Sequence, residues 1–369
     1  MTPHPPRADL DAAVLTWISK ERWEDDDNLF DALALRLFAH QYQYCEPYRR
    51  WCDALGRAPA RVTRWHDIPA VPSGAFKELR LASFPESNEV AVFQTSGTST
   101  ARRGALPLDT LSLYHASLRS SLDRMLFPDL TPGQRMTLRF LAPSPEASPE
   151  SSLSHMFGRL LADRGDEHSG YDVRDGALEG SRAVDALAQG CERGRPVALL
   201  GTAFSFVHLL EQMGSARFTL PPGSRVMETG GFKGKAREVP REALHASLAE
   251  AFGLGSRAIC NQYGMTELGS QFYDSVWCDP AGPRRKLIPP WVRVQLLDPE
   301  SELPVAPGAP GLIQIHDLAN TGSVAAIRTA DLGRALPGEP DGFEVLGRLE
   351  GAEERGCSIA ADEMLEQDG

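Results

Sequence analysis

The sequence lacks the features that mark several protein classes. No apolar run approaches the roughly 18 residues that a membrane-crossing helix needs. Basic residues are not in excess, because 38 Lys and Arg stand against 50 Asp and Glu, a formal net charge of −12. A nucleic-acid-binding domain would carry a basic face. The first residues, 1–7, lack the apolar core of a secretory signal. We therefore expect a cytoplasmic protein with no membrane span and no nucleic-acid partner.

Cysteine is scarce, and its spacing excludes the common metal and redox motifs. No two cysteines form a Cys-x-x-Cys pair, and no histidine stands at a spacing that suits zinc. The six cysteines lie at positions 45, 52, 191, 260, 278 and 357. We expect reduced thiols, as in a cytoplasm, with most of them buried as small apolar residues.

Strand and helix patterns alternate through the middle of the chain. Helical spacing of apolar residues first predicts helices over 8–56. Later segments alternate, which argues for a parallel sheet covered by helices on both faces. The predicted strands are 137–141, 196–200, 224–229 and 258–263, and the predicted helices are 154–161, 181–191, 203–213 and 236–252. After residue 285, short strands between turns predict a small antiparallel sheet.

These patterns predict an α/β fold with three parts. Residues 1–284 would form the α/β core with a helical N-terminus. Residues 285–346 would form a small β-rich subdomain, and residues 347–369 a mobile tail. Because ligands bind at the carboxyl ends of parallel strands, the glycine-bearing strand ends at 94–98, 230–231 and 263–267 could meet at one crevice.

A hydroxyl-rich loop follows a predicted strand at 90–93. Its residues are Thr95, Ser96, Gly97, Thr98 and Ser99. Small residues let backbone N–H groups and hydroxyls approach an anion closely. A predicted helix at 107–127 would follow, which is the order expected where a phosphate meets a helix N-terminus. The alternative is an exposed linker rich in Ser and Thr.

A second polar cluster contains Tyr263, Gly264, Thr266 and Glu267. The ring of Tyr263 could stack on a nucleobase, and Glu267 offers a hard oxygen to Mg²⁺ or to a Mg²⁺-bound phosphate. The alternative is a turn in which Thr266 and Glu267 serve as helix-capping residues.

Two further polar residues have two interpretations each. Asp331 lies in a predicted turn, where its carboxylate could bind ribose hydroxyls or simply close the turn. His155 lies in a predicted helix, either as a packed histidine or as a wall of a ligand pocket.

In their order and rough spacing these motifs resemble those of the adenylate-forming enzymes, which include acyl-CoA synthetases, luciferases and nonribosomal adenylation domains. The motifs are Thr-Ser-Gly-Thr-Ser, Gly-Gly, Tyr-Gly-Met-Thr-Glu, Thr-x-Asp and Gly-Arg. Within that superfamily, Gly-Gly-Phe-Lys-Gly-Lys-Ala-Arg-Glu-Val, Tyr-Gly-Met-Thr-Glu-Leu and a late Arg-Gly-Cys-Ser resemble the acyl-protein synthetase (LuxE) family of bacterial fatty acid reductase systems. The resemblance spans most of residues 60–360.

The resemblance implies ATP and Mg²⁺ as cofactors and assigns roles to single residues. The loop of Thr95, Ser96, Gly97, Thr98 and Ser99 would hold the β- and γ-phosphates, with Arg103 replacing the charge of the family's lysine. Gly230 and Gly231 would line the adenine, and Tyr263, followed by Gly264, would stack on it. Thr266 would face the α-phosphate, Glu267 would bind the magnesium, Asp331 and Arg348 would contact the ribose, and His155 would lie near the acyl pocket.

The chain departs from typical synthetases after the Gly-Arg motif. A C-terminal domain with an assisting lysine usually follows there, and we expect that domain to be absent here. Acyl-protein synthetases are similarly short, and a cysteine near their C-terminus takes the acyl group. Cys357 is the only cysteine in that position. The alternative is an incidental exposed thiol.

The resemblance therefore implies a ligase that activates a carboxylic acid as acyl-AMP, and we expect that acid to be a fatty acid. The acyl group would pass to Cys357 as a thioester and then to an acyl-CoA-reductase-type protein partner. One alternative is a ligase that delivers an acyl or aryl acid to CoA or to a carrier protein. Another is a non-catalytic nucleotide-binding module.

Overall fold

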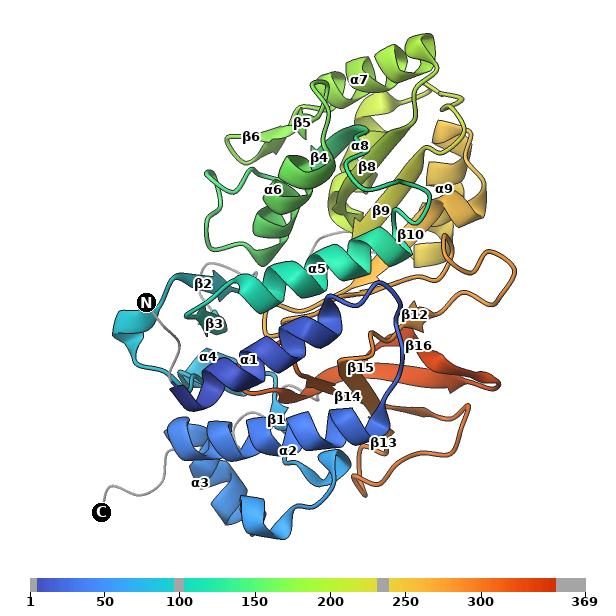
Figure 1. The fold of residues 1–369 in the computed structure, drawn as a ribbon. Helices are drawn as coiled ribbons and strands as arrows, with labels where there is room; N and C mark the ends of the chain where they lie inside the picture. The colour runs from blue at the N-terminus through green and yellow to red at the C-terminus, as the bar shows by residue number, and fades with distance from the viewer. Residues whose placement is uncertain (1–4, 96–102, 231–238, 350–369) are drawn as a thin grey trace. The chain divides into compact units, whose positions relative to one another are not determined.

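A computed structural model describes residues 5–95, 103–230 and 239–349 of the chain (Figure 1). Its contacts divide the chain into two compact units. Unit 1 comprises Met1–Ser120, Met265–Phe272 and Lys286–Gly369, and unit 2 comprises Ser121–Gly264 and Tyr273–Arg285. The expected division at residues 284 and 346 rests on composition and stays a prediction. Each unit is described by itself.

Unit 2 is built on the predicted parallel sheet. Its strands follow the order β11-β10-β9-β8-β4-β5, and the pairs from β10 to β5 are all parallel. The bounds are β4 Thr137–Leu141, β5 Gly170–Tyr171, β8 Val197–Thr202, β9 Arg225–Thr229, β10 Ile259–Tyr263 and β11 Phe272–Tyr273. β8 and β9 are buried along nearly their whole length, as expected of strands covered on both faces. The expected α/β class with a parallel sheet is confirmed.

Helices return the chain between these strands. They are α6 Ser152–Arg164, α7 Gly180–Arg193, α8 Ala203–Met213 and α9 Arg241–Phe252. Thr202 caps α8 by accepting a hydrogen bond from the Ser205 amide, and Ser205 completes the capping box. α9 ends at Gly253, whose φ of 62° is the left-handed conformation that favours glycine. A short hairpin of β6 Val173–Arg174 and β7 Ala177–Leu178 precedes α7.

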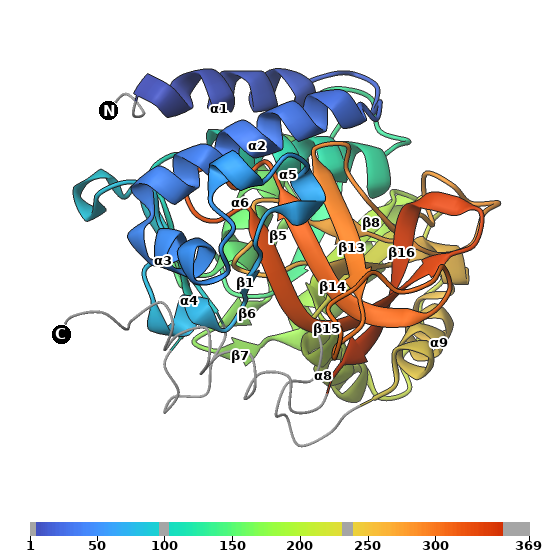
Figure 2. The ribbon, with the colours of Figure 1, turned by 90° about the horizontal axis from the view of Figure 1, so that it is seen from below.

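Unit 1 contains the N-terminal helices that the sequence predicts and a second sheet. The helices are α1 Pro5–Ile18, α2 Asp27–Tyr44, α3 Glu46–Ala54 and α4 Ala75–Glu78. The sheet order is β12-β16-β15-β14-β13, antiparallel throughout, with β1 added parallel to β15 (Figure 2). The bounds are β1 Val71–Pro72, β12 Lys286–Leu287, β13 Val292–Leu297, β14 Pro310–Asp317, β15 Ala326–Leu336 and β16 Glu339–Arg348.

The predicted helix at 107–127 is wrong at its start. β2 Ala91–Gln94 and β3 Ala105–Leu108 form an antiparallel hairpin, and the helix that follows is α5 Ser112–Met125. Pro107 fits a strand but lacks the amide that a helix interior would use. Pairing with β2 satisfies the backbone groups of 105–108 instead. The hydroxyl-rich loop therefore connects two strands and does not lead into a helix.

Asp331 does not lie in a turn, as the sequence suggests, but inside β15. The sequence signals for a turn were the polar residues around it, whereas Asp331 pairs with Arg348 as the terminal pair of the ladder between β15 and β16. Within the described ranges, no helix combines the length and apolar character needed to cross a membrane.

Candidate functional site

The β15–β16 hairpin places Asp331 and Arg348 opposite each other. Arg348 Nε lies 3.5 Å from Asp331 Oδ1, and the side chains are 43% and 20% exposed. Thr329 Oγ1 orders this end of β15, because it donates to Ile313 O at 2.9 Å and accepts from Asp331 N at 3.1 Å. An ion pair this exposed adds only about 0–1 kcal/mol to stability. Its contact with ribose stays a prediction.

The base of the hydroxyl-rich loop is a tight pair of hydrogen bonds. Thr95 N donates to Gly104 O at 2.8 Å, and Gly104 N donates to Thr95 Oγ1 at 2.9 Å. Arg103 Nη1 donates to Gln94 Oε1 at 3.2 Å. The loop residues Ser96, Gly97, Thr98 and Ser99 lie outside the described residues. The structure therefore locates the two ends of the predicted phosphate loop at the loop end of the β2–β3 hairpin.

Thr266 and Glu267 lie in the segment 265–272, which belongs to unit 1. Glu267 is buried and Thr266 is half-buried. The carbonyl oxygen of Glu267 accepts a hydrogen bond from Asn320 Nδ2 at 2.9 Å. No capping role follows from this geometry, because residues 266–267 form a turn and no helix begins there.

A carboxylate at Glu267 fits the chemistry of magnesium. Mg²⁺ prefers hard oxygens and is usually held by one or two carboxylates together with substrate phosphates and water. The described part of the chain contains no group of three or more His, Cys, Asp or Glu side chains that could hold a metal ion. A magnesium ion at this place would therefore take its oxygen ligands from Glu267 and from the phosphates of ATP.

In unit 2, the ends of two adjacent parallel strands bring two predicted residues close together. Gln262 of β10 pairs with Thr229 of β9, so Tyr263 and Gly230 follow at neighbouring strand ends. Gly230 is exposed and has a φ of 75°, a conformation that favours glycine. Tyr263 is half-buried, and Gly264 after it is exposed. Gly231 lies outside the described residues.

Sequence reasoning missed the buried polar cluster just before this strand end. Glu228 Oε1 accepts a hydrogen bond from Asn261 Nδ2 at 2.7 Å and lies 3.0 Å from His245 Nε2. Glu228 is 1% exposed. The three residues come from β9, β10 and α9. The signal in the sequence was a glutamate within the short predicted strand 224–229.

His155 lies in the first turns of α6 and is half-buried. Burial, and then the charge of Arg159, lower the pKa of its imidazole. The ring is therefore neutral at pH 7, which suits a wall of an apolar pocket as well as a packed helix position. Its place near an acyl chain stays a prediction.

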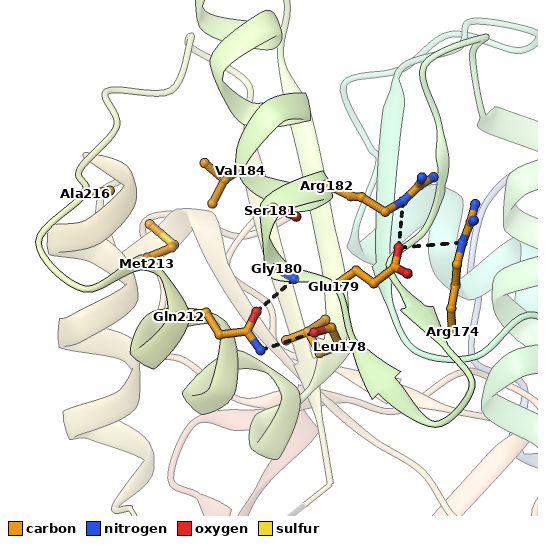
Figure 3. Close-up of a pocket in the computed structure, with 10 residues that line it drawn as sticks. All are labelled: Arg174, Leu178, Glu179, Gly180, Ser181, Arg182, Val184, Gln212, Met213 and Ala216. Carbon is orange, nitrogen blue, oxygen red and sulfur yellow. Dashed lines mark hydrogen bonds and ion pairs between the residues drawn. The ribbon is translucent and has the colours of Figure 1, made fainter.

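A hollow of about 930 Å³ opens on unit 2 between the β6–β7 hairpin, α7 and α8 (Figure 3). Its charged groups pair with one another, since Glu179 lies 3.7 Å from Arg174 and 3.4 Å from Arg182. Gln212 bridges the two helices by donating to Leu178 O and accepting from Gly180 N. None of the predicted site residues lines this hollow. It is lined by Arg174, Leu178, Glu179, Gly180, Ser181, Arg182, Val184, Gln212, Met213 and Ala216.

Cys357 lies outside the described residues, but the other cysteines bear on its role. Burial raises the pKa of Cys45 to about 11 and that of Cys52 to about 12. Burial also raises the pKa of Cys191 and of Cys278. Because the thiolate is the nucleophile, these four thiols are poor acyl acceptors at neutral pH.

The family model described as acyl-protein synthetase, LuxE, matches residues 9–127 and 172–366. The chain is 23% identical over 368 residues to a long-chain-fatty-acid–luciferin-component ligase of Aliivibrio fischeri, covering 97% of this chain and 94% of that protein. A ligase of the same name from Vibrio harveyi is 22% identical, over 94% of this chain and 91% of its own.

Among solved structures, the fold resembles 2-hydroxyisobutyryl-CoA ligase in complex with 2-HIB-AMP and CoA. The TM-score is 0.63 at 16% identity, covering 87% of this chain and 75% of that ligase. A second structure of that ligase, with R3-HIB-AMP, gives a TM-score of 0.64 at the same identity, over 88% and 68% of the two chains. At this identity the likeness establishes the fold.

Proposed function

This chain belongs to the acyl-protein synthetase (LuxE) family and is an acid–thiol ligase, and from that premise we propose that it activates a fatty acid with ATP and carries the acyl group on Cys357. The observation that carries the proposal is the family match, because it includes residues 9–127 and 172–366 and so every predicted contact except His155. The pairing of Asp331 with Arg348 across β15 and β16 supports the proposal, since the resemblance assigns both residues to the ribose.

The first step would make a mixed anhydride. One oxygen of the fatty carboxylate attacks the α-phosphorus of ATP, the bond between the α-phosphorus and its bridging oxygen breaks, and pyrophosphate leaves with the electron pair. When bound, Mg²⁺ neutralises charge on the phosphates. Glu267 would hold that ion, Thr266 would donate to the α-phosphate, and Arg103 with the hydroxyl-rich loop would hold the departing phosphates. Preorganised donors of this kind stabilise the charge that develops in the transition state.

The second step would transfer the acyl group to sulfur. The thiolate of Cys357 attacks the acyl carbonyl carbon, and the bond from that carbon to the phosphate oxygen breaks. AMP leaves with the electron pair, and the product is a thioester on the protein. We extend the proposal to a reductase-type protein partner that accepts this acyl group, because the resembling systems have one.

The test separates the two steps. The chain is incubated with ATP, Mg²⁺ and radiolabelled fatty acid, and label released from the protein by hydroxylamine is measured beside acid-dependent pyrophosphate exchange. Cys357→Ser is expected to keep the exchange and lose the label, whereas Cys278→Ser, the matched control, keeps both. Label that persists on Cys357→Ser contradicts the acceptor role.

Two further measurements bear on the same proposal. Glu267→Ala is expected to lower the exchange itself by roughly 10²-fold or more, the scale on which one transition-state contact acts. Product analysis with CoA present distinguishes the family activity from delivery to CoA, because acyl-CoA formed by Cys357→Ser at the parent rate would show that the thiol of CoA is the acceptor.

A further inference from the structure

We propose that Asp317, the last residue of β14, and Asn320, in the turn that follows, are positioning residues for acid activation: they clamp the main chain of the segment 265–272 and so set the direction of Thr266 and Glu267. The inference rests on the proposed function, in which those two side chains contact ATP and its metal ion. All residues of the clamp belong to unit 1.

Asn320 holds the segment at Glu267 itself. Its amide Nδ2 donates to Glu267 O at 2.9 Å and to Val324 O at 3.1 Å. The side chain is 2% exposed. The main chain of Asn320 is fixed in turn by Gln41, whose Nε2 donates to Asn320 O at 3.0 Å. Since Asn320 is buried and bonded on both sides, it carries the position of Glu267 O rigidly to β14 and α2.

Asp317 holds the segment three residues further on. Its Oδ1 accepts from Ser270 Oγ at 2.8 Å and from Ala319 N at 3.0 Å. Ser270 Oγ also accepts from Ser117 Oγ at 2.9 Å and from Trp291 Nε1 at 3.0 Å. Asp317 and Ser270 are 0% and 1% exposed. The hydrogen bonds through Asp317 Oδ1 and Ser270 Oγ therefore tie the main chain at residue 270 to the end of β14.

Gly269 shows how closely the segment lies on the turn. A Cβ atom at residue 269 would stand 2.9 Å from Ala319 C and 3.0 Å from Ala319 O. Both are backbone atoms, so neither can move aside as a flexible side chain would. The segment is therefore held by hydrogen bonds at 267 and 270 and by direct main-chain packing at 269.

Holding the main chain at residues 267, 269 and 270 fixes the positions of Thr266 and Glu267, which are proposed to contact ATP and its metal ion. A displacement of about 1 Å in a reacting or positioning group can lower a rate by about 10²-fold. The acyl transfer to Cys357 needs no metal ion and no pyrophosphate contact. Thr266 would still meet the phosphate of acyl-AMP, so a loosened clamp is expected to impair the first step clearly more than the second, whereas a general loss of folding impairs both equally.

The experiment uses the full chain and two variants that disturb the clamp by different means. Asn320→Ala removes both donors, and Gly269→Ala adds a Cβ without removing a polar group. Tyr48→Phe is the matched control, because it removes another buried hydrogen bond of unit 1, from Tyr48 to Pro69 O at 2.8 Å, away from the segment. Melting temperatures are measured for all four proteins.

Each protein is assayed for pyrophosphate exchange against Mg²⁺ concentration, and for acylation of Cys357 from added synthetic acyl-AMP. Binding of ATP is measured by calorimetry with Mg²⁺ and with EDTA. Both clamp variants are expected to lose at least about 10-fold in kcat of exchange, to need more Mg²⁺ for half-maximal rate and to gain less ATP affinity from Mg²⁺. Their acylation from acyl-AMP should fall clearly less than their exchange, and Tyr48→Phe should match the parent in both assays.

Equal loss of both steps in the clamp variants, or an unchanged exchange rate, would overturn the positioning role. If the parent itself shows no exchange, the proposed function fails, and the calorimetric comparison still decides the clamp. The positioning role is overturned if Mg²⁺ raises the ATP affinity of parent and variants equally. It is supported if Mg²⁺ raises the ATP affinity less in both clamp variants than in the parent.

Discussion

The sharpest stability prediction concerns the carboxyl group of Asp317. Burial raises the pKa of this group from 3.8 to about 6, although hydrogen bonds from Ser270 and Ala319 act in the opposite direction. Its second oxygen, Oδ2, is buried and accepts no hydrogen bond from the described residues. An ionised carboxylate there is poorly solvated, so the folded protein holds the proton more tightly than the unfolded chain does.

The sign of the pH effect follows from this difference. Because the folded-state pKa is the higher one, the stability that the protonated acid contributes is fully present below pH 3.8. That contribution is lost as the pH rises towards about 6. Two pKa units correspond to roughly 3 kcal/mol. Asp317→Asn removes the titration, so its stability relative to the parent should rise by up to about 3 kcal/mol between pH 4 and pH 7.

Urea unfolding of the parent and Asp317→Asn at a series of pH values measures this. The amide also alters hydrogen bonds in the turn, but that effect does not depend on pH and cancels when only the slope of the difference is read. A difference in unfolding free energy that stays flat between pH 4 and pH 7 would show that the carboxyl titrates normally, and it would refute the reasoning.

Three further predictions follow from buried or paired charges. Burial lowers the pKa of His316 from 6.5 to about 3. The folded protein therefore loses stability as the pH falls below 6.5, because the unfolded chain takes up the proton more readily. His316→Gln should lose less stability than the parent between pH 6.5 and pH 4 in the same unfolding series. Arg225 is 1% exposed and donates to Leu126 O and to Asp129, whose side chain is 42% exposed. Arg225→Met should therefore cost roughly 1–3 kcal/mol, because a buried carbonyl loses its partner while water can solvate Asp129. An unchanged melting temperature would count against this. Arg348→Gln should raise the KM for ATP in exchange while changing stability by less than about 1 kcal/mol, because its pair with Asp331 is exposed; a KM equal to that of the parent would remove Arg348 from the ribose site.

Local sequence patterns determined most of the elements of unit 2. The strands predicted at 137–141, 196–200, 224–229 and 258–263 correspond to β4, β8, β9 and β10. They were predictable because a strand buried on both faces is a short apolar run, and the helices between them show helical periodicity. The order of motifs along the chain also led to the family, which the comparison confirms.

The site contacts could be predicted only in part. The residues proposed to meet ATP were chosen because glycine, hydroxyl and carboxylate groups stand out in a sequence, and their contacts stay a prediction. The residues that hold them were not found, because Asn320 and Asp317 lie some fifty positions after Glu267 and no local pattern links the two segments. The cluster of Glu228, His245 and Asn261 was not predicted for the same reason.

The amino-acid sequence by itself determined the α/β class, the parallel sheet and the family, because these depend on short-range burial patterns and on residue types. Tertiary structure decided which backbone groups pair. It turned residues 105–108 into a strand, placed Asp331 inside β15 opposite Arg348 and laid the segment 265–272 on the turn after β14. Each of these depends on hydrogen bonds between residues distant in the chain, whose energies exceed the local preferences that the sequence displays.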